Sequence, residues 1–188
     1  LARARMYFLS SLSPYLKRRG FVRCPDAEYS QATAFGPTYD EAINDPDGNG
    51  GMNDYAYGLY PSYGYNYAYL APVSDTGGSP CPNGPDSCAT RQNAGDTSRG
   101  VSIASIDEPA STVAMADAAA WSSTTSTFSF GYFAITPPGW WDSTYYHGRV
   151  DVRHNETANI LFADGHVKAL KIGAISDPDL WRIHKVNP

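Results

Sequence analysis

Near the C-terminus, two β-favouring runs joined by a turn constrain the fold more than any other part of the sequence. The runs are Ala158–Ala163 and His166–Leu170, and Asp164-Gly165 lies between them. Asp-Gly is preferred in two-residue hairpin turns because both positions need positive φ. Alternation places Ile160 and Phe162 on one face and apolar neighbours on the other, so this strand lies inside the protein or between subunits. We predict a β-hairpin over residues 158–170.

Glycine and proline limit the rest of the fold. The 188 residues include 17 Gly and 14 Pro, which excludes a helical bundle or a coiled coil. The 14 Tyr and 4 Trp argue against disorder, because disordered chains are poor in aromatic residues. A chain of this length suits one domain, which we expect to be loop-rich and to contain β-strands.

Residues 1–20 are the one stretch whose pattern predicts helix, in two pieces: one ends near Ser11 and a short one covers Pro14–Arg19. Ser13-Pro14 indicates an N-cap followed by proline at the first helical position, and Gly20 indicates the C-terminal stop. The longest apolar run there, Met6–Leu9, is far too short to span a bilayer. We therefore divide the chain into a helical segment, residues 1–20, and a globular β domain, residues 21–188.

Aromatic residues are concentrated in two places. Between Tyr63 and Tyr69 every second residue is tyrosine, which in a strand places the rings on one face. That face either packs in the core or forms a carbohydrate-stacking or subunit-contact surface. The candidates for such contacts are Tyr63, Tyr65, Tyr67, Trp140 and Trp141. Two further strands are expected over Val101–Ile106 and Thr112–Met115.

An Asp/Asn-rich loop resembles the first half of a calcium-binding loop. Asp45, Asp47 and Asn49 alternate before Gly50, and alternate side-chain oxygens can converge on Ca²⁺. Ala56 stands where an EF-hand needs its bidentate Glu, so Asp54 or a distant acid would have to complete the site. The alternative is a polar turn that binds no ion.

The three cysteines have different predicted roles. Cys81 and Cys88 flank a six-residue spacer rich in turn formers and can close a local disulfide, which would imply an oxidising, extracytoplasmic compartment. The alternative is two free thiols in a loop. Cys24 is left without a partner in this pairing.

Charge and motifs exclude several functions. The net charge of −5 argues against nucleic-acid binding, which needs a basic surface. No nucleophile elbow, phosphate-binding loop or helical zinc motif is present, so we expect no enzymatic activity. The alternative enzyme would use His154, Asp164 and His166 with a bound metal ion. The other interpretation of these residues is structural. In it, the ring nitrogens of His154 hydrogen-bond backbone groups near the end of the hairpin, and Asp164 caps the turn.

Nine residues separate His154 from Asp164-Gly165. This spacing resembles the H-X9-DG signature of the prepilin-type, processing-associated family of pseudopilin-like bacterial proteins. Other landmarks occur in the order that family has. They are Leu1–Arg5, Pro14–Lys17, Phe21–Pro25, Tyr63–Tyr67, Pro109 with Thr112-Val113, and Ala116-Asp117.

The resemblance implies a pilin-like α+β fold, in which an N-terminal helical segment precedes a loop-rich antiparallel sheet. It implies a structural subunit of an extracellular or secretion-associated filament, exported to the cell surface. Its partners would be further copies of itself and the pilus or secretion machinery, with membrane contact only through a hydrophobic helix that this chain lacks. The alternative is an extracellular module that binds carbohydrate or secretion substrates through exposed Tyr and Trp. Ca²⁺ is the one cofactor expected.

Overall fold

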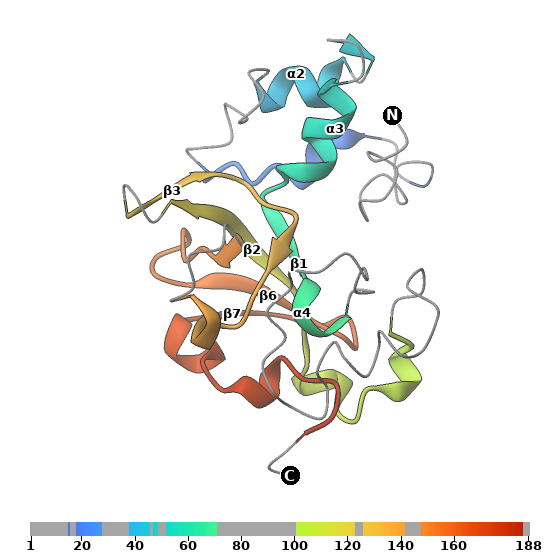
Figure 1. The fold of residues 1–188 in the computed structure, drawn as a ribbon, viewed down its shortest axis with the longest axis vertical. Helices are drawn as coiled ribbons and strands as arrows, with labels where there is room; N and C mark the ends of the chain where they lie inside the picture. Colours follow the sequence, from blue (N-terminus) through green and yellow to red (C-terminus); the bar gives the residue numbers. More distant parts are fainter. Residues whose placement is uncertain are drawn as a thin grey trace.

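A seven-stranded mixed sheet organises the chain (Figure 1). The computed structural model describes residues 15, 18–27, 38–45, 47–48, 52–70, 101–122, 126–141 and 148–185. The strands are β1 (Tyr63–Asn66), β2 (Val113–Ser122), β3 (Thr127–Phe130), β4 (Ala134–Ile135), β5 (Gly148–Val150), β6 (Ala158–Phe162) and β7 (Val167–Leu170). Their main order is β4-β1-β2-β6-β7, and β3 and β5 also pair with β2.

Strand β2 is the centre of this sheet. Its first half pairs with β1 and β6, and its second half pairs with β3 and β5. Four alanines within it are buried, namely Ala116, Ala118, Ala119 and Ala120. One strand can pair with four others because it is ten residues long and each half of it has a partner strand on both edges.

The helices are short. They are α2 (Tyr39–Asn44), α3 (Met52–Leu59) and α4 (Tyr67–Leu70), with 3-10 turns η3 (Arg19–Val22), η6 (Ile103–Ser105), η7 (Pro109–Ser111), η8 (Pro138–Trp140), η9 (Ile172–Ile175) and η10 (Pro178–Leu180). Figure 1 shows α2 and α3 together at one end of the molecule. Thr38 and Glu41 form a capping box that begins α2. Within the described ranges, no helix has the length and apolar character needed to cross a membrane.

The predicted α+β class is therefore wrong, because the described chain is mostly β and contains no long helix at its N-terminal side. Arg18 has extended backbone angles, φ −143° and ψ 139°, and Gly20 lies inside η3 instead of ending a helix. Residues 1–14 and 16–17 of the predicted helical segment lie outside the described residues. The sheet is mixed instead of antiparallel because β1 and β4 run parallel.

The pairing of β4 with β1 depends on Gly64. A Cβ atom at Gly64 would lie 2.7 Å from Ala118 Cβ and 2.7 Å from Ile135 Cγ2. Only glycine allows neighbouring backbone and side chains to approach this closely. Strand β4 has two residues, too few for an alternating pattern to predict it.

The C-terminal hairpin is confirmed, with a different turn. Strands β6 and β7 pair antiparallel, and Ile160 and Phe162 are buried on one face as expected. Phe162 accepts a hydrogen bond from Gly165 N–H and donates one to His166 C=O, so three residues form the loop. Among them only Gly165 has positive φ, at 97°. The turn is thus a three-residue loop ending in a left-handed glycine, and not the predicted two-residue turn.

Other strand predictions had mixed outcomes. The tyrosine alternation is a strand only from Tyr63 to Asn66, after which the chain turns into α4. The strand predicted over Val101–Ile106 is wrong, since η6 lies there, whereas the strand predicted over Thr112–Met115 is confirmed by β2.

Two apolar clusters stabilise the fold. The larger one joins the sheet to the C-terminal 3-10 turns and includes Ile135, Ile160 and the fully buried Trp181. The smaller one lies under α2 and α3 and includes Val22 and Tyr57. The segment before β1 is thereby held against the sheet, and Ser62 N–H donates to Val22 C=O at 2.9 Å.

Candidate functional site

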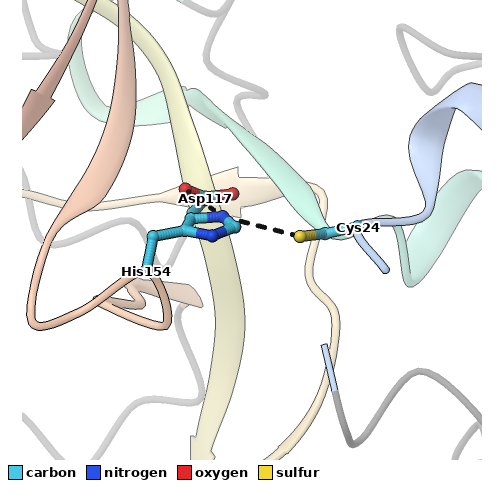
Figure 2. Close-up of side chains that lie close together, drawn as sticks. All are labelled: Cys24, Asp117 and His154. Atoms are coloured by element: carbon cyan, nitrogen blue, oxygen red, sulfur yellow. Dashed lines mark hydrogen bonds and ion pairs between the residues drawn. The ribbon is translucent and has the colours of Figure 1, made fainter. Parts of the chain in front are cut away.

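Cys24, Asp117 and His154 meet on one side of β2 (Figure 2). His154 Nε2 lies 3.5 Å from Cys24 Sγ and 3.3 Å from Asp117 Oδ2. One ligand atom from each residue lies within 4.8 Å of the other two. Among the described residues, this is the one group of three His, Cys, Asp or Glu side chains close enough to share a metal ion.

Three separate parts of the chain supply these side chains. Cys24 follows η3, Asp117 lies in the middle of β2, and His154 precedes β6. Tyr63 is paired with Asp117 across β1 and β2, so both side chains lie on the same face of the sheet. The site therefore joins the segment after η3 to the sheet and to the start of the C-terminal hairpin.

A tight turn sets the position of His154. The backbone N–H and C=O of His154 both bond those of Thr157, at 3.1 and 3.0 Å. The two residues between them, Asn155 and Glu156, have positive φ of 50° and 62°. Such a pair of conformations is typical of the type I′ hairpin turn, in which glycine is preferred at the second position. Glu156 occupies that position at a cost in backbone strain.

Asp117 is completely buried. Its Oδ2 atom accepts a hydrogen bond from Asn159 N–H at 2.6 Å, whereas Oδ1 is buried with no hydrogen-bond partner. Burial raises the pKa of Asp117, and the Asn159 N–H and the charges of Arg153 and His154 oppose this rise. A buried carboxylate with an unpaired oxygen is unusual, because buried polar atoms nearly always have partners.

The other two members also have outer partners. His154 Nδ1, the ring nitrogen that does not contact Asp117, lies 2.9 Å from Asp26 Oδ2. The Tyr63 hydroxyl hydrogen-bonds the Cys24 thiol. Burial, with the nearby Cys24 and Asp117 groups, raises the pKa of Tyr63 to about 12. Tyr63 is therefore a neutral hydrogen-bond donor to sulfur at physiological pH.

The chemistry open to this site is limited by access. Cys24 is a free thiol that is only 2% exposed. A cysteine nucleophile must meet its substrate and is found in partly exposed surroundings, so the Cys24–His154 pair does not have the setting of a hydrolase. Sulfur, imidazole nitrogen and carboxylate oxygen are instead the donor types that bind zinc.

The structure corrects the hypothesis for His154. Its ring nitrogens face the side chains of Asp26, Asp117 and Cys24 instead of backbone groups. The hypothesis for Asp164 is confirmed, since its Oδ1 accepts from His166 N–H at 3.1 Å and lies 2.6 Å from His166 Nδ1.

The alternative enzyme site is not assembled. His154 precedes β6, whereas Asp164 and His166 follow it. Five strand residues span roughly 17 Å at about 3.3 Å per residue. The group at the hairpin loop and the group at His154 therefore lie at opposite ends of β6.

The calcium prediction stays a prediction. Asp45 ends α2 and is exposed, as is Asp47. Asn49 and the side chain of Asp54 lie outside the described residues. Asp45 C=O accepts hydrogen bonds from Gly48 N–H at 3.1 Å and from the Asn53 side chain at 2.8 Å, which order the start of this loop. Cys81 and Cys88 also lie outside the described residues, so their disulfide stays a prediction.

The aromatic candidates are partly engaged within the fold. The Tyr65 hydroxyl donates to Leu70 C=O at 3.0 Å, and the Trp141 indole N–H donates to Thr136 C=O at 3.1 Å. The guanidinium of Arg149 lies over the Trp141 ring, 5.5 Å from its centroid. The side chains of Tyr67 and Trp140 lie outside the described residues.

Sequence reasoning missed Cys24 and Asp117 as members of a site. A signal for Asp117 was present: it is the one charged residue between Val113 and Ser122, a run rich in alanine. A charge within an apolar strand is rarely buried unless it has a partner. Nothing in the sequence identified His154 as that partner.

No protein-family model matches this chain, and no curated protein or solved structure is significantly similar to it. The resemblance to the H-X9-DG family therefore depends on the motif residues themselves.

Proposed function

We propose that this chain is a non-enzymatic structural subunit of an extracellular or secretion-associated filament, which acts through packing of one protomer against the next. The resemblance to the H-X9-DG family supports the proposal, and so do the roles of the motif residues. His154 joins three segments, Asp164 caps the hairpin loop, and Gly165 has the positive φ that the loop requires. Each of these roles is structural.

The observation that carries the proposal is the open edge of the sheet at β7. Among the described strands, β7 pairs with β6 alone. Three of its four residues are exposed, and Val167 is 59% exposed. An unpaired, partly apolar edge strand is a template for a strand of another chain. A second copy of this chain is the partner that fits a homopolymer.

The direction of the backbone groups agrees with this role. Phe162 N–H bonds His166 C=O, and bonded pairs alternate along an antiparallel ladder. Lys168 and Leu170 therefore direct their backbone groups toward β6, whereas Val167 and Ala169 direct theirs outward. The side chains of Tyr65 and Trp141 give less support to the alternative carbohydrate-binding module, because their polar groups bond backbone carbonyls of the same chain.

Electron microscopy and sedimentation of the purified chain test the proposal. We expect the parent to form ordered filaments, and Val167→Lys to reduce the sedimenting fraction because it places a charge at the β7 edge. Ile103→Lys is the matched control, since Ile103 is 58% exposed but lies in η6. Ala169→Pro removes an outward N–H without removing a bond to β6. A parent that remains monomeric in all conditions, or a Val167→Lys variant that polymerises like the parent, would overturn the proposal.

A further inference from the structure

We propose that Cys24, Asp117 and His154 bind one zinc ion, which links the segment after η3 to β2 and to the C-terminal hairpin. This site differs from the predicted calcium loop in both its residues and its chemistry. Calcium prefers oxygen ligands only, whereas one sulfur, one imidazole nitrogen and one carboxylate oxygen are ligands that zinc takes.

The two distances from His154 Nε2 to its neighbours fit a tetrahedral ion. Zinc bonds sulfur at about 2.3 Å and nitrogen or oxygen at about 2.0–2.1 Å, so tetrahedral angles separate sulfur from nitrogen by about 3.5 Å and nitrogen from oxygen by about 3.3 Å. The observed separations are 3.5 Å for Cys24 Sγ and His154 Nε2, and 3.3 Å for His154 Nε2 and Asp117 Oδ2. These two separations match those of tetrahedral ligands, and the ligand atoms of Cys24 and Asp117 lie within 4.8 Å of each other.

The unpaired oxygen of Asp117 is an independent reason to expect an ion. Oδ1 is fully buried and has no hydrogen-bond donor, although the residue lies in the centre of the sheet. A buried carboxylate with an unpaired oxygen costs free energy, and a cation at Oδ2, the oxygen that faces His154, would offset the buried charge of the whole group. Because the Asn159 N–H bonds Oδ2, the orientation of the carboxylate is fixed before any ion arrives.

The outer partners are those of a metal centre. Metal-binding histidines commonly direct their second ring nitrogen to a carboxylate, which fixes the tautomer and the ring orientation. Asp26 does this for His154 Nδ1, at 2.9 Å, and leaves Nε2 facing Cys24 and Asp117. The Tyr63 hydroxyl hydrogen-bonds the Cys24 sulfur. Three protein ligands leave the fourth tetrahedral position to water or another small ligand.

The competing explanation is that Asp26 and Asp117 hold His154 between them without a metal. This explanation accounts for the positions of both carboxylates, but it does not explain why the Cys24 thiol lies beside His154. The two explanations differ in a measurable way, because only the metal site uses sulfur as a ligand.

Cobalt titration distinguishes them. Tag-free protein of the full chain, freed of metal in reducing buffer, is titrated with Co²⁺ and then with Zn²⁺. We expect one Co²⁺ per chain, a sulfur-to-cobalt charge-transfer band, and displacement of Co²⁺ by an equal amount of Zn²⁺. Cys24→Ser abolishes the band, and both Cys24→Ser and His154→Gln weaken cobalt affinity by at least about tenfold.

Two controls locate the site. His184→Gln removes an exposed histidine outside the cluster, and the double variant Cys81→Ser, Cys88→Ser removes the other thiols; both keep the band. Since a variant could fail to fold, the parent is also tested by alkylation: the buried Cys24 thiol reacts only when it becomes transiently exposed, and added Zn²⁺ should slow that reaction further. Absence of the band in the folded parent, or its retention in Cys24→Ser, would overturn the proposal and leave the metal-free contacts of His154 with Asp26 and Asp117 as the explanation.

Discussion

The side-chain amide of Asn66 donates a hydrogen bond to the backbone carbonyl of Trp181, 115 residues further along the chain, at 3.0 Å. The same amide donates to Val113 C=O at 2.9 Å, and Asn66 is completely buried. One side chain thus holds the end of β1, the start of β2 and the C-terminal segment together.

Asn66→Ala is expected to lower the free energy of unfolding by about 2 to 4 kcal/mol, because it leaves two buried carbonyls without a donor. Urea unfolding followed by tryptophan fluorescence measures the change. Asn44→Ala, at an exposed position at the end of α2, is the control and should change stability by less than about 0.5 kcal/mol. Equal effects of both substitutions would contradict this assignment.

Gly64→Ala is expected to destabilise the protein by about 1 to 3 kcal/mol, because the new methyl group would overlap Ala118 and Ile135. Gly173→Ala provides the comparison, since a Cβ atom there meets nothing within 4 Å. Thermal unfolding of both variants checks the difference. If the two glycines tolerate alanine equally well, the close packing of β1 against β4 is not required.

Glu156→Gly is expected to stabilise the protein by about 0.5 to 1 kcal/mol, because glycine adopts the positive φ of this turn without strain. The substitution also removes an exposed ion pair with Lys171, which contributes little. Glu156→Ala loses the same ion pair but keeps the strain, so it should show no gain. A gain in both variants would assign the effect to charge instead of backbone conformation.

The stability of the hairpin loop is expected to depend on pH through Asp164. Hydrogen bonds from the backbone N–H and the ring of His166 lower the pKa of Asp164 below its ordinary value of 3.8. A lowered carboxyl pKa gives stability that is present above 3.8 and is lost as pH falls through the folded-state pKa. The difference in urea midpoint between the parent and Asp164→Asn should therefore be constant near neutral pH and shrink below about pH 4. A difference that grows on acidification would reverse the assignment.

Local patterns predicted the parts of the fold that depend on local sequence. Alternation over Ala158–Phe162 predicted the hairpin and its buried face, because successive side chains in a strand point to opposite faces. The tyrosine alternation failed after Asn66, where two hydrogen bonds to distant carbonyls override the local pattern. The turn type was also missed, since Asp164-Gly165 suits both two- and three-residue loops.

The candidate site was only half predictable. His154 was identified from its spacing to Asp164-Gly165, but its partners come from residues 24, 26 and 117. Contacts between residues this far apart depend on strand pairing and on how η3 packs, and neither is encoded in a short motif. Asp117 could be recognised as a buried charge, whereas its pairing with His154 required the sheet.

The pairing scheme of β2 also determines when the protein can fold. Its partners begin at Tyr63 and end at Phe162, and the Cys24–His154 contact closes a separation of 130 residues. Proteins dominated by such long-range contacts have high contact order and fold slowly, because chain entropy is lost before the contacts form. The central sheet cannot be completed while the ribosome still holds the C-terminal hairpin. Until residues 158–170 are available, the apolar β2 segment remains exposed to other chains.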